Sequence, residues 1–165
     1  MTYDLITVGR VTMDLFARDI GVPFEQVSGF DTSVGGSPTN VAIAASRLGL
    51  RSLAFTGVGD VLGGGYVRRF RRDECVGIEC VVTVPGKHTS LAMVAIQPPD
   101  RFPLTFYRDD PADIHLTVDD AERLPYAQAS AMLISGNAFS RGSCVEAARA
   151  CGARAGDVGL SLYMD

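Results

Sequence analysis

The fold expected for this chain follows first from GGSPTN at residues 35–40, which runs into VAIAASRLG at residues 41–49. The two glycines of this stretch permit close backbone approach and positive φ angles, and its proline suits the first turn of a helix. The alanine-rich run predicts a buried helix over residues 39–48 that ends at Gly49. The unpaired N–H groups at such a helix start attract oxygen-rich ligands. The stretch is therefore interpreted either as a ligand site or as a plain strand–helix turn.

The glycine loop matches neither of two common nucleotide-binding patterns. No Lys-Ser or Lys-Thr pair follows the glycines, as a Walker loop requires, and the spacing differs from G-x-G-x-x-G. Gly57 and Gly59 form a second pair, but the third glycine of the dinucleotide spacing is missing. The sequence therefore does not predict a nicotinamide site.

Short apolar runs alternate with helix patterns along the chain, which predicts an open α/β sheet. Residues 15–34 carry glycine and proline among apolar positions, which favours edge strands or a small flap. A further pair of strands is expected on either side of Pro98-Pro99-Asp100. The expected core strands are residues 3–8, 52–56, 131–135 and 158–162, and the expected outer strands are residues 90–97 and 104–107. Two further helices are expected. One spans residues 66–73 after a glycine loop, and the other spans residues 143–151 and ends at Gly152. Thr117 is expected to cap a helix, with two aspartates in its first turn.

Composition limits the classes of partner. The net charge of −4 argues against nucleic acid, and the arginine cluster at residues 68–72 is interpreted as a solvated helix face. The four cysteines show no metal-ligand spacing and are interpreted as free buried thiols, with Cys144 and Cys151 on one helix face. No signal peptide and no run of membrane-spanning length is evident, so a cytoplasmic protein is expected.

Three segments place the glycine loop in a wider pattern. DLITVG at residues 4–9 precedes Asp14, and FTGVGD at residues 55–60 follows the loop. This order resembles the amino-terminal half of ribokinase-like (PfkB-type) carbohydrate kinases, over essentially the whole chain. Within that family, GGSPTNVA at residues 35–42 and PPDRFPLTFYR at residues 98–108 are similar to the 5-dehydro-2-deoxygluconokinases of inositol breakdown.

The resemblance implies a fold and a domain organisation. It implies a ribokinase-like, open, mostly parallel sheet flanked by helices, with residues 1–165 as the amino-terminal part of one kinase domain. Residues of about 15–34 and 88–108 would form a small β-strand lid over the sugar. Since the lid pairs subunits in many relatives, a homodimer through the lid is also implied.

The resemblance also implies a sugar site. Asp14 would accept hydrogen bonds from sugar hydroxyls, Gly35 and Gly36 would let the backbone approach the sugar, and Asn40 would both donate and accept. Ligands in such sheets collect outside the carboxyl ends of the strands, where these residues are expected to gather. The alternatives are that Asp14 is a turn residue and that Asn40 only stabilises the loop.

Tyr107 and Arg108 are the residues expected to separate a sugar acid from a neutral sugar. A guanidinium fork matches a carboxylate with two parallel hydrogen bonds, and related kinases of keto-deoxy sugar acids carry a similar pair on the lid. The alternative is an exposed Arg108 paired with the adjacent Asp109 or Asp110.

The implied reaction transfers the γ-phosphoryl group of ATP, with Mg²⁺, to 5-dehydro-2-deoxygluconate. In the family, the catalytic base and the anion hole come from a G-A-G-D motif in the carboxyl-terminal half. AGD at residues 155–157 arrives too early, and Arg154 stands where the first glycine belongs. We therefore expect no catalytic residue, no metal ligand and no ATP site in this chain, which is interpreted as a truncated and inactive kinase. A 2-dehydro-3-deoxygluconate kinase, a fructokinase, and a non-catalytic sugar-binding or dimerising fragment are the alternatives.

Overall fold

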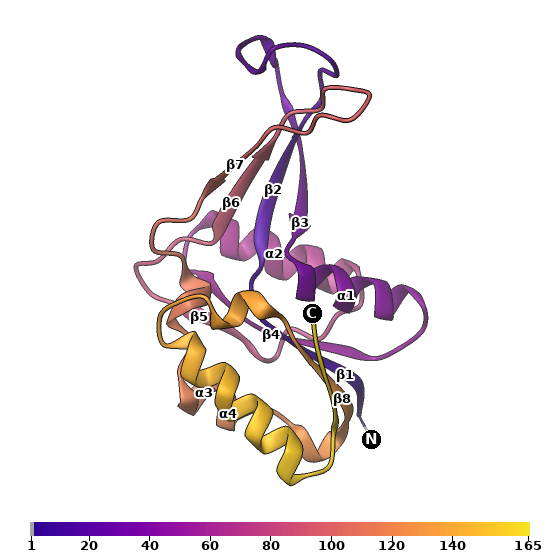
Figure 1. Cartoon of the computed structure of the whole chain (residues 1–165), viewed down its shortest axis with the longest axis vertical. Helices are drawn as coiled ribbons and strands as arrows, with labels where there is room; N and C mark the ends of the chain where they lie inside the picture. The colour runs from indigo at the N-terminus through magenta and orange to yellow at the C-terminus, as the bar shows by residue number, and fades with distance from the viewer. Residues whose placement is uncertain (1) are drawn as a thin grey trace.

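The computed structural model describes residues 2–165 and contains two sheets (Figure 1). The larger sheet is parallel throughout and confirms the expected α/β class. Its strands, in spatial order, are β5 (Val81–Val84), β4 (Ser52–Gly59), β1 (Tyr3–Val8), β8 (Ala129–Ile134) and β9 (Ser161–Met164). The helices are α1 (Ser37–Arg47), α2 (Leu62–Asp73), α3 (Val118–Glu122) and α4 (Cys144–Asp157), and the short 3₁₀ turns are η1 (Phe24–Gln26), η2 (Ala112–His115), η3 (Tyr126–Gln128) and η4 (Gly136–Phe139).

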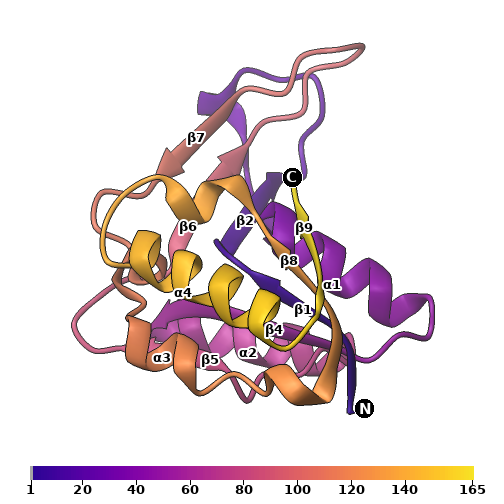
Figure 2. The same ribbon diagram turned by 60° about the horizontal axis from the view of Figure 1, so that its bottom comes forward.

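The parallel sheet has a hydrophobic core on each face. Every residue of β4 is buried, because alternate side chains of this strand enter opposite cores. Leu53 and Phe55 pack with α4, whereas Ala54 and Val58 pack with α1 and α2. Figure 2 shows α3 and α4 in front of the sheet and α2 behind it. This three-layer arrangement fixes the carboxyl ends of the strands as the edge where loops can form a site.

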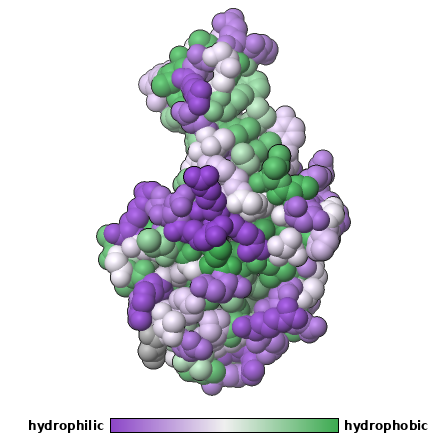
Figure 3. Space-filling model, turned by 180° about the vertical axis from the view of Figure 1, so that it is seen from behind, coloured by the Kyte–Doolittle hydropathy of each residue, from purple (hydrophilic) through white to green (hydrophobic). Residues whose placement is uncertain are grey.

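The second sheet is a lid that projects from the parallel sheet (Figure 1). Its strands, in spatial order, are β3 (Phe30–Gly35), β2 (Thr12–Ala17), β6 (Ser90–Val94) and β7 (Leu104–Tyr107). β2 is antiparallel to β3 and parallel to β6, and β6 is antiparallel to β7. Hydrophobic residues cover much of the projecting lid in the space-filling view (Figure 3).

Two of the predicted boundaries on the α1 and α2 side are wrong. The glycine loop is shorter than expected, since α1 begins at Ser37 with proline in its first turn. The glycines at 63–65 belong to α2 rather than to a loop before it. A Cβ atom on Gly64 would overlap the carbonyl oxygen of Gly59, so glycine lets the start of α2 sit directly against the end of β4.

The predicted end of the last helix is also wrong. Gly152 does not stop α4, which continues to Asp157, and the following strand begins at Ser161 rather than at residue 158. Cys144 and Cys151 do share the buried face, and Ala155 extends that face by one more turn. The packing of this apolar stripe on the sheet outweighs the helix-breaking tendency of one glycine.

Two surface interpretations need correction. Arg71 is only 1% exposed, so the arginine cluster is not simply a solvated face. Cys75 is exposed and Cys80 partly so, and only Cys144 and Cys151 are buried thiols. Thr117, by contrast, caps α3 as expected and forms a capping box with Asp120. Among residues 2–165, no helix combines the length and the apolar character that crossing a bilayer requires.

Candidate functional site

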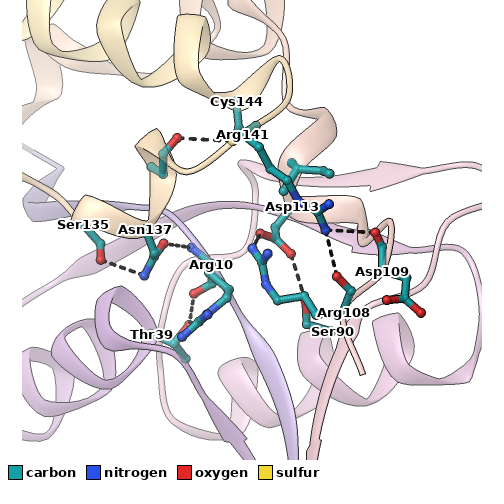
Figure 4. A network of polar contacts seen from close by, with 12 residues as sticks. Arg10, Thr39, Ser90, Arg108, Asp109, Asp113, Ser135, Asn137, Arg141 and Cys144 are labelled. Carbon is teal, nitrogen blue, oxygen red and sulfur yellow. Dashed lines mark hydrogen bonds and ion pairs between the residues drawn. The ribbon is translucent and has the colours of Figure 1, made fainter. Parts of the chain in front are cut away.

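The candidate site lies where β1 ends and the chain enters the lid. Gly9 has a φ of 142°, and the backbone N–H of Arg10 then donates to Oδ1 of Asn137 at 2.9 Å. Asn137 belongs to η4, directly after β8, and its amide donates to the hydroxyl of Ser135 at 2.8 Å. Neighbouring parallel strands therefore bring these loops together at one edge of the sheet (Figure 4).

Asp14 lies inside β2, not in a turn, and its carboxylate rests against the glycine loop. A Cβ atom on Gly35 would overlap Oδ2 of Asp14, so glycine is needed for this approach. The Thr12 hydroxyl bonds to the carboxylate, but Oδ1 is buried without a hydrogen-bond partner among the described residues. Burial raises the pKa of Asp14, because a carboxylate loses hydration there. This unpartnered oxygen of Asp14 can accept a hydrogen bond from a hydroxyl group of a ligand.

Gly36 and Asn40 lie on the other side of the same loop. Gly36 has a φ of 100°, and a Cβ atom there would overlap the carbonyl oxygen of Arg10. Both glycines of the loop thus allow contact with the protein's own chain, beside any contact with a ligand. Asn40 is exposed on the first turns of α1, and its backbone N–H donates to the carbonyl of Gly36 at 2.9 Å.

Arg108 is partly buried and forms an ion pair with Asp113, not with Asp109 or Asp110 as the alternative supposed. Asp113 is 5% exposed and also accepts from the Ser90 hydroxyl at 3.0 Å. Burial raises the pKa of Asp113, and the guanidinium of Arg108 opposes this effect only in part. Arg108 is therefore already neutralised within the chain.

Strand register separates Tyr107 from Asp14. Asp14 pairs with Ala92, and Ala92 with Phe106, so these side chains share one face of the lid. Tyr107 is paired with Leu91, which alternation places on the opposite face. That face borders a cavity of about 620 Å³ whose lining includes Tyr107, Leu91, Met13, Lys87 and His88. The structure therefore does not bring Tyr107 together with Asp14.

Arg10 is the residue of this site that the sequence analysis missed. Its guanidinium carbon lies 5.1 Å from the centre of the Phe106 ring, on the Asp14 face of the lid. Desolvation lowers the pKa of Arg10, and the nearby charge of Arg108 adds to this effect. The available signal was an arginine directly after the glycine that ends the first strand.

No metal site is found in the part of the chain that the structure describes: residues 2–165 hold no group of three or more His, Cys, Asp or Glu side chains arranged to bind an ion. At the start of α1, Asp165 accepts from the Ser37 hydroxyl and from the backbone N–H of Gly136 at 3.0 Å. No step of chemistry is assigned to these residues.

A parallel sheet with a four-stranded lid over this polar cluster defines a ribokinase-like sugar kinase fold. The chain belongs to the pfkB family of carbohydrate kinases, whose model matches residues 3–162. It is 35% identical over 147 residues to a 5-dehydro-2-deoxygluconokinase of Listeria monocytogenes, covering 88% of this chain and 45% of the relative. A 5-dehydro-2-deoxygluconokinase of Bacillus thuringiensis is 35% identical over 145 residues, which are 87% of this chain and 44% of that protein.

Solved structures agree with this assignment. A PfkB protein from a Polaromonas species superposes with a TM-score of 0.89 at 26% identity, over 99% of this chain and 55% of its own. A fructokinase from Xylella fastidiosa gives a TM-score of 0.88 at 22% identity, over 100% of this chain and 50% of its own, and has also been solved with bound ATP. The chain thus spans about half the length of the relatives that it matches.

Proposed function

We propose that this chain carries the sugar-acid site of an ATP-dependent kinase that phosphorylates 5-dehydro-2-deoxygluconate in inositol breakdown. One observation carries the proposal. A buried carboxylate oxygen of Asp14 has no hydrogen-bond partner among residues 2–165. The carboxylate lies near Arg10, at the carboxyl ends of the parallel strands. Such a pair suits a ligand that offers both hydroxyl donors and an anionic group. The names of the relatives that match over most of this chain support the choice of sugar.

The proposed binding residues are Asp14, Gly35, Gly36, Asn40 and Arg108. Asp14 would accept from sugar hydroxyls through its unpartnered oxygen, and the two glycines keep the loop close enough for the sugar to reach it. Arg108 would border the site while Asp113 holds its guanidinium in place. Tyr107, which the sequence also predicts as a binding residue, has the least support, because it lies on the opposite face of the lid from Asp14.

The proposal assigns ATP, Mg²⁺ and the catalytic base to the part of the relatives' length that this chain does not span. When bound, ATP with Mg²⁺ supplies the phosphoryl group and neutralises its charge. The residues described here bind and orient the acceptor sugar, which by itself lowers the barrier through proximity. We therefore expect residues 1–165 alone to form no ADP with any sugar in a coupled assay. Turnover by a preparation free of host kinases would contradict this division of roles.

The lid supports a further part of the proposal, a homodimer. Phe16, Leu104 and Phe106 are large apolar side chains that share one face of the lid strands and are 37–49% exposed. An apolar surface of this kind is typical of an interface. Sedimentation over a range of concentrations tests the dimer. A monomer at all concentrations would refute pairing through the lid in this chain.

Calorimetry tests the sugar site directly. We expect 5-dehydro-2-deoxygluconate to bind the chain more tightly than fructose does, and Asp14→Asn to weaken both at least roughly tenfold, because a buried acceptor is lost. Asp19→Asn is the matched control, since Asp19 lies in the lid loop and binds the Ser28 backbone N–H and hydroxyl at 2.7 Å. Equal effects of the two variants, or no binding of either sugar, would refute the proposed site.

A further inference from the structure

The site contains two arginines, but only one has a carboxylate partner. Arg108 is paired with Asp113, whereas Arg10 forms no ion pair within 4.0 Å among the described residues. The Nε atom of Arg10 is buried and lacks a hydrogen-bond partner; the same holds for Nε of Arg108, but Arg108 reaches Asp113 through its Nη2 atom. A partly buried guanidinium without an ion-pair partner is costly in a folded protein, because it has lost water without gaining an acceptor. Arg10 is therefore the cation of this site that is open to an external anion.

Arg10 is also held in a fixed position. Its backbone N–H donates to Asn137, and its carbonyl oxygen accepts from the Thr39 hydroxyl at 3.5 Å. Gly36 packs against the same carbonyl, and the guanidinium lies over the Phe106 ring. Contacts from η4, α1 and the lid thus constrain one residue, as Figure 4 shows for Asn137 and Thr39. A guanidinium that is already oriented loses little entropy when it binds a planar carboxylate.

The charges around Arg10 specify the kind of ligand. Arg108 lies close enough to lower the pKa of Arg10, while Asp14 and Asp113 oppose that effect. Asp113 is committed to Arg108, and Asp14 is oriented by Thr12 and the glycine loop. A ligand that brings a carboxylate to Arg10 and hydroxyl groups to Asp14 would give Arg10 an anionic partner and the unpartnered Oδ1 of Asp14 a donor. A neutral sugar would satisfy only Asp14.

We infer that Arg10, rather than Arg108, binds the carboxylate of the substrate and so sets the preference for a sugar acid over a neutral sugar. This inference rests on the proposed function, since it names the residue that would bind the negatively charged group of the proposed substrate. Arg108 still borders the sugar in this proposal, but its guanidinium is committed to Asp113. Its ion pair with Asp113 and the hydrogen bonds from Arg141 to the carbonyls of Arg108 and Asp109, at 2.8 and 2.9 Å, hold the end of β7 next to Arg10.

The test compares 5-dehydro-2-deoxygluconate with its methyl ester, which keeps the ketone and the hydroxyls but lacks the charge. Dissociation constants are measured by calorimetry for the wild-type chain and for Arg10→Met, Arg10→Lys and Arg123→Met. Methionine keeps much of the packing against Phe106, and lysine keeps the charge but not the fork. Arg123 is the matched control, an exposed arginine that pairs with Asp120 beside α3. The Nε–H signal of Arg10 is followed by NMR in the isotope-labelled chain.

The wild-type chain is expected to prefer the acid over the ester roughly tenfold to a hundredfold. Arg10→Met should remove that preference by weakening the acid alone, Arg10→Lys should restore part of it, and Arg123→Met should match the wild type. The Arg10 Nε–H signal should shift with the acid and not with the ester. If Arg10→Met does not fold, the lysine variant and this signal decide the question.

The outcomes separate the inference from the function on which it rests. If the wild type prefers the acid but Arg10→Met keeps the same ratio, or if the Nε–H signal does not respond to the acid, Arg10 is not the carboxylate partner and the sugar site stands. If the wild type binds neither compound, the proposed function fails, and the inference fails with it.

Discussion

Replacing Arg71 by methionine is expected to stabilise this protein. Arg71 is 1% exposed between α1 and α2, and its Nε and Nη1 atoms have no partner among the described residues. Its Nη2 atom donates to the Thr39 hydroxyl at 2.5 Å, and no carboxylate pairs with it in residues 2–165. Desolvation lowers the pKa of Arg71 to about 10, so the side chain is still charged at neutral pH.

The magnitude follows from the two opposing contributions. Removing an uncompensated buried charge recovers several kcal/mol of lost hydration, while losing the hydrogen bond to Thr39 costs about 1 kcal/mol. Methionine is close to arginine in length and fills irregular apolar space, so little cavity is left. We expect a net gain of about 1–3 kcal/mol in the free energy of unfolding, or roughly 2–4 °C in Tm for each kcal/mol.

Urea denaturation of the wild type and Arg71→Met measures this change, with Arg69→Met as the control. Arg69 lies on the same helix with 82% of its side chain exposed, so its replacement should alter stability by less than about 0.5 kcal/mol. The advantage of Arg71→Met should shrink as the pH rises through about 10 and beyond, because the folded wild type then releases a proton that the unfolded chain still holds, and its own stability increases. A loss of 1 kcal/mol or more in Arg71→Met would contradict this prediction, since it would mean that the buried charge is compensated.

Three further predictions concern stability. Gly35→Ala should cost about 1–3 kcal/mol in denaturant unfolding, because the new Cβ atom overlaps the Asp14 carboxylate, and a neutral result would mean that the loop can move away. The stability of the wild type relative to Asp113→Asn should fall as the pH rises above the ordinary pKa of 3.8, because burial raises the pKa of Asp113 and the folded chain keeps a proton that the unfolded chain has released; melting curves that show a constant difference from pH 3 upward would contradict this. Thr117→Ala should cost about 0.5–2 kcal/mol, since it breaks the capping box with Asp120, and an unchanged Tm would show that α3 does not need its cap.

Local chemistry was enough to predict the elements of the fold. A mainly apolar run such as residues 3–8 is typical of a strand covered on both faces, which favours a parallel sheet flanked by helices. The GGSP sequence places a positive φ and a proline where a helix begins, and α1 does begin there. Thr117 and Asp120 carry the capping pattern within four residues of one another. Each of these signals depends on neighbours in the sequence.

The composition of the site depends instead on contacts between distant parts of the chain. Whether Asp14 and Tyr107 share a face depends on the pairing of β2 with β6 and of β6 with β7, and no local pattern fixes that register. The ion-pair partner of Arg108 is Asp113 rather than the adjacent Asp109 or Asp110, because η2 brings Asp113 close to the end of β7.

Local signals and contacts between distant residues therefore account for different features of this protein. The sequence determined the α/β class, the glycine loop and the start of α1, because propensity and apolar pattern act over a few residues. The tertiary structure decided that Arg10 is the site's unpaired cation and that Arg71 is buried, because burial and charge compensation are properties of packed neighbours from α1, α2, η2 and the lid.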